Sequence, residues 1–242
     1  MEQIYTIPVN EAFDAGLEEG ACACPFCTLY KKLQEDELDI ILGASMMEPD
    51  IRIMTNRQGF CPTHYKKMLS RKRRLGMGLM LESHLPDVKA RLKGTPLSHL
   101  ASVGLLLTLE KDCYVCTRID KNLSAMIATA VYLYGTDEAF RKKFEGQPYF
   151  CLPHYRMMID YASKKMAKKE FKEFFPVAER IVAAYLDTLE KDVSWFCKKF
   201  DYRYKDEPWY DSKDAVERSM KLLRSDLHHP PQKKKSAGNA NN

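Results

Sequence analysis

The sequence predicts an all-α protein, a helical bundle made of two pseudo-repeats that are each held together by a Cys3His metal site. Apolar residues recur at helical spacing along most of the 242-residue chain, and alternating strand patterns are nearly absent. Hydrophobic residues make up 45% of the chain and charged residues 29%, which is enough apolar material for a sizeable core. A CxxC motif followed by a CxxH motif occurs in each half of the chain.

The helices of the first half are marked by residues that start or stop them. Asn10 is a candidate N-cap, Pro25 and Pro62 fit first-turn positions, and Gly43 ends a helix. An irregular link precedes the CxxH motif, and Pro86 interrupts the helix that follows it. The expected helices span residues 11–19, 26–42, 62–85 and a short segment up to 94.

The second half repeats this plan and is followed by further helices. Thr136 is a candidate N-cap, Pro153 opens a helix, and Pro176 interrupts a long one. The expected helices span residues 97–112, 115–134, 137–145, 155–167, 170–204 and 211–227. We therefore predict repeats at 1–94 and 95–168, C-terminal helices packed on them at 169–227, and a disordered basic tail at 228–242.

The cysteine motifs form an internal repeat. Cys24-Pro-Phe-Cys27 and Cys61-Pro-Thr-His64 match Cys113-Tyr-Val-Cys116 and Cys151-Leu-Pro-His154, with offsets of 89 residues for the first pair and 90 for the second. The flanking segments 60–69 and 150–159 are identical at five of ten positions. A duplicated unit of about 90 residues is the economical explanation.

Each half thus supplies three cysteines and one histidine, which suits a closed tetrahedral zinc site. We expect the ligands to close within each half, as Cys24/Cys27/Cys61/His64 and Cys113/Cys116/Cys151/His154, because a duplicated unit should have begun as a self-sufficient one. The spacing also permits a crossed arrangement. The alternatives for the motifs are buried reduced thiols and a thioredoxin-like redox pair, although the latter needs a βαβ context.

Charge and compartment restrict the partners. The net charge is +5, of which +4 lies from Lys213 onward, so the body is nearly neutral. Eight cysteines without a secretory signal favour a reducing compartment, and we expect a cytoplasmic protein without a membrane span. The basic stretch Lys66–Arg74 could contact nucleic acid, but we favour a solvated face that is partly balanced by the acidic run 35–39. We also expect Cys197 to be a core thiol.

The motifs CPxC and GFCxxH resemble those of an uncharacterised bacterial family that is labelled only as a domain of unknown function. The matching segments are Cys24–Cys27 and Gly59–His64, with Cys113–Cys116 and Phe150–His154 in the second copy. The second copy departs from the pattern, since it has no proline inside CxxC and Tyr149 replaces the glycine. The resemblance implies metal binding in a helical protein and no established activity.

These observations predict a non-catalytic zinc protein, with two zinc ions per chain and a helical surface for an unknown protein or nucleic-acid partner. Four protein ligands leave no open position for activating water. An iron–sulfur redox or sensor protein with the same ligands is the alternative. A third hypothesis is an enzyme whose metal keeps an open position; the common hydrolase and nucleotide-binding motifs are absent from the sequence.

Overall fold

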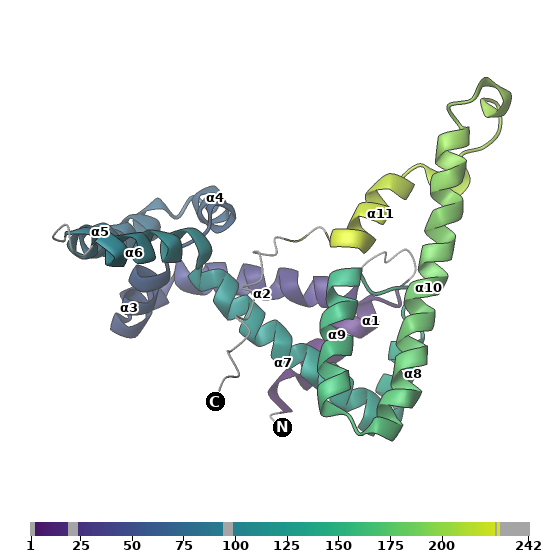
Figure 1. Cartoon of the computed structure of the whole chain (residues 1–242), viewed down its shortest axis with the longest axis horizontal. Coiled ribbons are helices and arrows are strands. Elements are labelled where there is room, and N and C mark those ends of the chain that lie inside the picture. Colours follow the sequence, from purple (N-terminus) through teal and green to yellow (C-terminus); the bar gives the residue numbers. More distant parts are fainter. Residues whose placement is uncertain (1–2, 19–23, 94–98, 226, 228–242) are drawn as a thin grey trace. The chain divides into compact units, whose positions relative to one another are not determined.

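The structure, a computed structural model, describes residues 3–18, 24–93, 99–225 and 227, and every regular element in these residues is helical (Figure 1). The all-α prediction is confirmed. Within the same residues, no helix combines the length and the apolar character needed to cross a membrane. The α-helices are α1 (Thr6–Ala15), α2 (Pro25–Ile41), α3 (Pro49–Gln58), α4 (Pro62–Ser70), α5 (Arg74–Leu92), α6 (His99–Lys111), α7 (Tyr114–Thr136), α8 (Glu138–Glu145), α9 (Leu152–Lys165), α10 (Lys168–Lys198) and α11 (Ala215–Arg224). Short 3-10 turns lie at Gln3–Tyr5, Ala44–Met47, Tyr202–Tyr204 and Tyr210–Ser212.

The chain forms two compact units. The first unit contains the residues up to Leu33 and those from Lys121 to Leu227, and the second contains Gln34–Asp120. Helices α2 and α7 therefore contribute residues to both units. Each unit combines chain from both sequence repeats.

Aromatic side chains form the core of the first unit. Phe13 of α1 packs against Phe140 and Phe144 of α8, with ring centroids 4.7 and 5.9 Å apart. Phe150 and Phe174 extend this cluster from the start of α9 and from α10. All five rings are buried. Their burial fixes α1, α8, α9 and α10 around one apolar centre.

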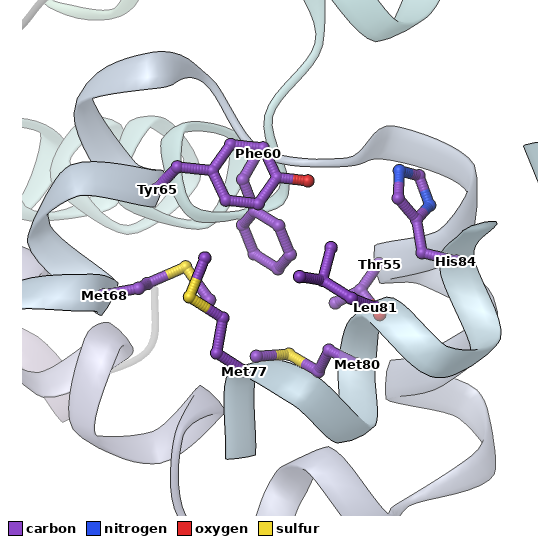
Figure 2. Close-up of a pocket in the computed structure, with 8 residues that line it drawn as sticks. All are labelled: Thr55, Phe60, Tyr65, Met68, Met77, Met80, Leu81 and His84. Atoms are coloured by element: carbon purple, nitrogen blue, oxygen red, sulfur yellow. The ribbon is translucent and has the colours of Figure 1, made fainter. Parts of the chain in front are cut away.

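The second unit has a smaller core in which methionines replace most of the phenylalanines. Met68, Met77 and Met80 surround Phe60 and lie beside Tyr65 (Figure 2). These side chains leave no room for a water molecule between them. Flexible thioether side chains fill irregular space in this way.

Two expected helix starts are wrong. Helix α1 begins at Thr6, and Asn10 lies inside it, where its side-chain amide donates to the Thr6 carbonyl. Helix α8 is capped by Asp137, whose carboxylate accepts from the backbone N–H groups of Ala139 and Phe140. A carboxylate at the N-cap satisfies two backbone N–H groups that have no partner within the helix. Thr136, the expected cap, is instead the last residue of α7.

The expected proline breaks are also wrong. Pro86 lies inside α5 and Pro176 inside α10. Contacts hold α5 on both sides of its proline, because His84 Nδ1 and an Arg91 guanidinium nitrogen lie 3.0 and 2.9 Å from the Asn56 carbonyl oxygen.

The break occurs instead at Lys72, which has a positive φ of 59° and separates α4 from α5. Helix α3, which packs against α5, occupies most of the expected irregular link.

Candidate metal centres

All four cysteine motifs lie at helix N-termini. Cys61 and Cys151 are the N-caps of α4 and α9, and Cys24 and Cys113 immediately precede α2 and α7. The second Cys of each CxxC motif and the His of each CxxH motif lie in the first helical turn. Each motif therefore directs two side chains to one point, next to the positive end of a helix dipole that favours thiolate.

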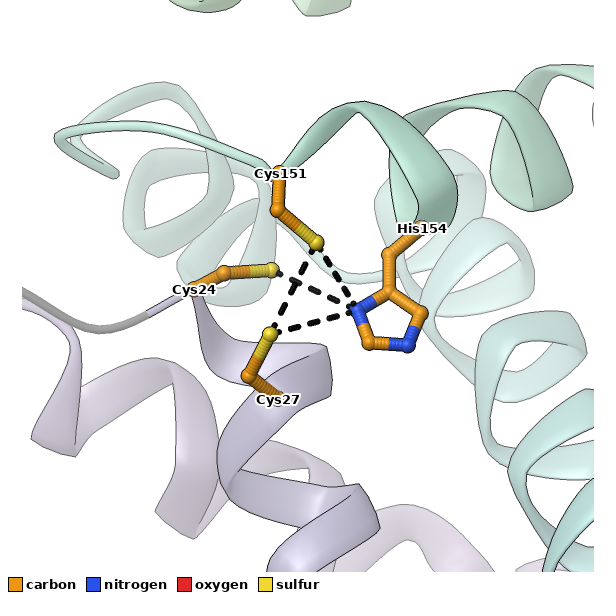
Figure 3. Close-up of side chains that lie close together, drawn as sticks. All are labelled: Cys24, Cys27, Cys151 and His154. Atoms are coloured by element: carbon orange, nitrogen blue, oxygen red, sulfur yellow. Dashed lines mark hydrogen bonds between the residues drawn. The ribbon is translucent and has the colours of Figure 1, made fainter. Parts of the chain in front are cut away.

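Cluster I consists of Cys24, Cys27, Cys151 and His154, all buried in the first unit (Figure 3). His154 Nδ1 lies 3.1 Å from Cys151 Sγ and 3.5 Å from Cys27 Sγ, and these two sulfurs are 3.6 Å apart. Cys24 Sγ lies 3.9 Å from His154 Nδ1. Ligands at about 2.0–2.3 Å from a tetrahedral zinc ion stand roughly 3.3–3.8 Å apart, so this donor set fits such an ion.

Cluster II consists of Cys61, His64, Cys113 and Cys116 in the second unit. His64 Nδ1 lies 3.2 Å from Cys61 Sγ and 3.3 Å from both Cys113 Sγ and Cys116 Sγ. Cys61 Sγ and Cys116 Sγ are 3.9 Å apart. Cys61 is partly exposed, while the other three residues are buried. The same donor set and the same spacing thus recur with one sulfur closer to solvent.

The expected closure within each half is wrong, because the ligands pair in the crossed arrangement. The CxxC of each half meets the CxxH of the other half. The geometry within each cluster gives the physical reason. His64 Nδ1 lies within 3.3 Å of the sulfurs of Cys61, Cys113 and Cys116, so its set of four candidate ligands is complete without the CxxC of its own half.

The thiols of cluster I share protons unequally. Burial acts to raise the pKa of Cys24, but hydrogen bonds from Cys151, Cys27 and His154 outweigh it and hold that pKa well below its usual range. Hydrogen bonds with Cys151 and Cys24 raise the pKa of Cys27. The hydrogen bond with Cys24 likewise raises the pKa of Cys151. The negative charge of a Cys24 thiolate thus makes the Cys27 and Cys151 thiols harder to ionise. A bound divalent cation would compensate this charge and allow all three to ionise.

Cluster II shows the same inequality. Hydrogen bonds from Cys113 and Cys116 lower the pKa of Cys61, and the bonds with Cys113 and Cys61 raise the pKa of Cys116. Burial acts to lower the pKa of His64, but hydrogen bonds to Cys113 and Cys61 raise it to about 9. Cluster II is therefore also a set of candidate metal ligands, and a bound cation would balance the negative charge of its thiolates.

The remaining candidate residues lie outside both clusters. Cys197 is exposed on α10, so its assignment as a core thiol is wrong. The basic tail predicted at 228–242 lies outside the described residues. In the basic stretch, Arg71 forms ion pairs with Glu35 and Asp39, so the acidic run does balance part of it.

Sequence reasoning missed the polar surroundings of cluster II. Gln34 Nε2 lies 2.9 Å from His64 Nε2, and Lys67 Nζ donates to Gln34 Oε1. Asp120 is also close enough for the charge of His64 to act on its carboxyl group. One signal was present in the sequence. When the two repeats are aligned, the polar residues Gln34 and Lys67 correspond to the apolar residues Leu123 and Met157.

The fold and the two clusters define an all-α protein with two Cys3His groups positioned to bind metal ions. The chain belongs to a family of unknown function, DUF6062, whose model matches residues 1–230. No curated protein and no solved structure matches the chain.

Proposed function

We propose that this protein is a zinc protein in which both Cys3His clusters bind a structural ion. The observation that carries the proposal is the convergence of eight side chains into two sets, each with its ligand atoms within 4.8 Å of one another. Three thiolates and one imidazole are ligands that zinc prefers in closed sites. Cys24, Cys27, Cys151 and His154 would hold one ion, and Cys61, His64, Cys113 and Cys116 the other.

The role that we propose is non-catalytic. Four protein ligands fill a tetrahedral zinc ion and leave no position for water, so the ion would stabilise each unit without activating a substrate. The helical surface would then bind a protein partner in the cytoplasm, where zinc–thiolate sites persist because cysteines stay reduced.

Elemental analysis with a visible spectrum, on protein purified without oxygen, tests the identity of the metal. We expect two zinc ions per chain and no visible colour, because zinc has a filled d shell. Iron and sulfide, with a broad visible band that bleaches on reduction, would overturn the proposal in favour of a cluster protein. Protein that binds neither metal would remove the proposal altogether.

A further inference from the structure

His64 has a buried polar partner on the side of its ring that faces away from the sulfurs. The side chain of Gln34 places Nε2 at 2.9 Å from His64 Nε2, while Nδ1 of the same ring faces the three cysteines. Gln34 is only 3% exposed. A buried amide at this distance restricts the rotation of the imidazole ring.

Lys67 in turn holds Gln34. Its ammonium group donates to Gln34 Oε1, and Lys67 lies on α4, one turn beyond His64. The contacts thus run from Lys67 through Gln34 and His64 to the cysteines of cluster II. A zinc ion with three thiolates and one neutral imidazole has a net charge of −1, so the ammonium group also offsets the charge of the loaded site.

The second sequence repeat lacks this pair. The offsets that align the motifs place Leu123 at the position of Gln34 and Met157 at that of Lys67. Leu123 is buried, as Gln34 is. A buried polar side chain is costly without a hydrogen-bond partner. If position 34 served packing alone, leucine would fill it as it fills position 123, so the glutamine indicates a polar role.

We propose that Gln34 is a positioning residue for the metal of cluster II, held in place by Lys67. This inference rests on the proposed function. When Nδ1 binds a metal, Nε2 keeps its proton and needs an acceptor, and a half-turn of the Gln34 amide supplies its oxygen. The half-turn moves this oxygen away from Lys67 and turns the NH2 group toward it, so the flexible Lys67 side chain must shift in order to donate to the second lone pair of the oxygen. Cluster II would then have an oriented histidine ligand whose orientation depends on a residue that binds no metal.

The repeat supplies the matched variants for a test. Gln34→Leu and Lys67→Met each install the residue of the second repeat, and Gln34→Glu keeps an acceptor for Nε2–H. Zinc affinity is measured for both clusters of the full chain by competition with a chelator. For Gln34→Leu we expect affinity at cluster II to fall about 10–100-fold, the usual effect of losing such a partner. Affinity at cluster I should stay unchanged and serve as the internal control.

The other variants separate positioning from packing. Gln34→Glu should retain affinity within a few-fold, and Lys67→Met should lose less affinity than Gln34→Leu. Proton NMR should show the His64 Nε2–H signal protected from exchange in the wild type and in Gln34→Glu, but not in Gln34→Leu.

Equal zinc affinity at cluster II in Gln34→Leu and wild type would overturn the inference, as would an equal loss in the Leu and Glu variants. If Gln34→Leu fails to fold, the other two variants decide the question. Zinc affinity at cluster II should then be lower in Lys67→Met than in Gln34→Glu, and the reverse order would overturn the inference. A wild-type chain without bound zinc would instead contradict the proposed function itself.

Discussion

The two clusters share their ligand types and their helix-terminal geometry, but their surroundings differ. Cluster I lies in the aromatic core, where Phe26 is 5.8 Å from Phe150 and 6.1 Å from the His154 ring, measured between centroids. Cluster II has a partly exposed cysteine and polar neighbours, Gln34 and Lys67. If both clusters bind the proposed zinc ions, we expect the shared donor types to select the same metal and the different surroundings to set how readily each ion exchanges.

The largest effect is expected from variants that test the crossed pairing. Cys24→Ser with Cys61→Ser removes one ligand from each cluster, so the chain should fall from two bound zinc ions to none. Cys24→Ser with Cys151→Ser removes two ligands from cluster I alone and should leave one ion. Metal content by elemental analysis checks both stoichiometries.

Pairing within each sequence repeat would give the opposite result, since Cys24 and Cys61 would then belong to one site. Cys197→Ser is the control, because this exposed thiol lies outside both clusters and its loss should leave two ions.

The next prediction compares His154→Ala with His64→Ala. Structural zinc contributes about 10–16 kcal/mol to folding in small zinc domains, and a domain has only about 5–15 kcal/mol of net stability. His154→Ala should therefore unfold the first unit, since α9 begins at cluster I and packs against α10 and α11.

Tryptophan fluorescence during thermal unfolding measures this difference, because both tryptophans, Trp195 and Trp209, lie in the first unit. His154→Ala should abolish the transition. His64→Ala should lose one zinc ion but keep the tryptophan transition within a few degrees. An equal loss in both variants would mean that the units do not fold separately.

A smaller effect is expected in the rate of metal release. Excess chelator should remove zinc in two phases, the faster from cluster II, because Cys61 is already partly exposed. A ratio of about tenfold corresponds to about 1.4 kcal/mol in the free energy of local opening. Zinc released to a colorimetric dye gives the two rates. Cys61→Ser should eliminate the fast phase, and persistence of both phases in that variant would contradict the assignment.

The sequence predicted which eight side chains come together but not how they are grouped. Motif spacing singled out these eight candidate ligands because CxxC and CxxH each fit one turn at a helix start. The grouping depends on which segments distant in the sequence fold together, and helical periodicity does not encode that. The CxxC of each half lies with the CxxH of the other half. Proline breaks failed for a related reason, since tertiary contacts such as those to Asn56 hold α5 together across Pro86.

The last prediction concerns Gly59, which precedes Phe60 and Cys61 at cluster II. Its φ of 60° and ψ of −157° lie in a region that only glycine adopts easily, and its carbonyl accepts a hydrogen bond from the Tyr114 N–H at 3.0 Å. At the matching position before cluster I stands Tyr149, whose ring stacks on Tyr185 at 4.3 Å. The special backbone is therefore a requirement of the second unit.

Gly59→Ala should destabilise the second unit by about 1–3 kcal/mol, the typical cost of a strained backbone conformation. Chemical denaturation, followed through metal release from cluster II, measures this loss. Gly78→Ala is the matched control: Gly78 lies in α5 with open space where a Cβ would be added, so alanine there should be neutral or stabilise by up to about 1 kcal/mol. A Gly59→Ala protein as stable as the control would show that the turn into cluster II does not depend on this backbone conformation, and the contrast with Tyr149 would then lie in the side chains alone.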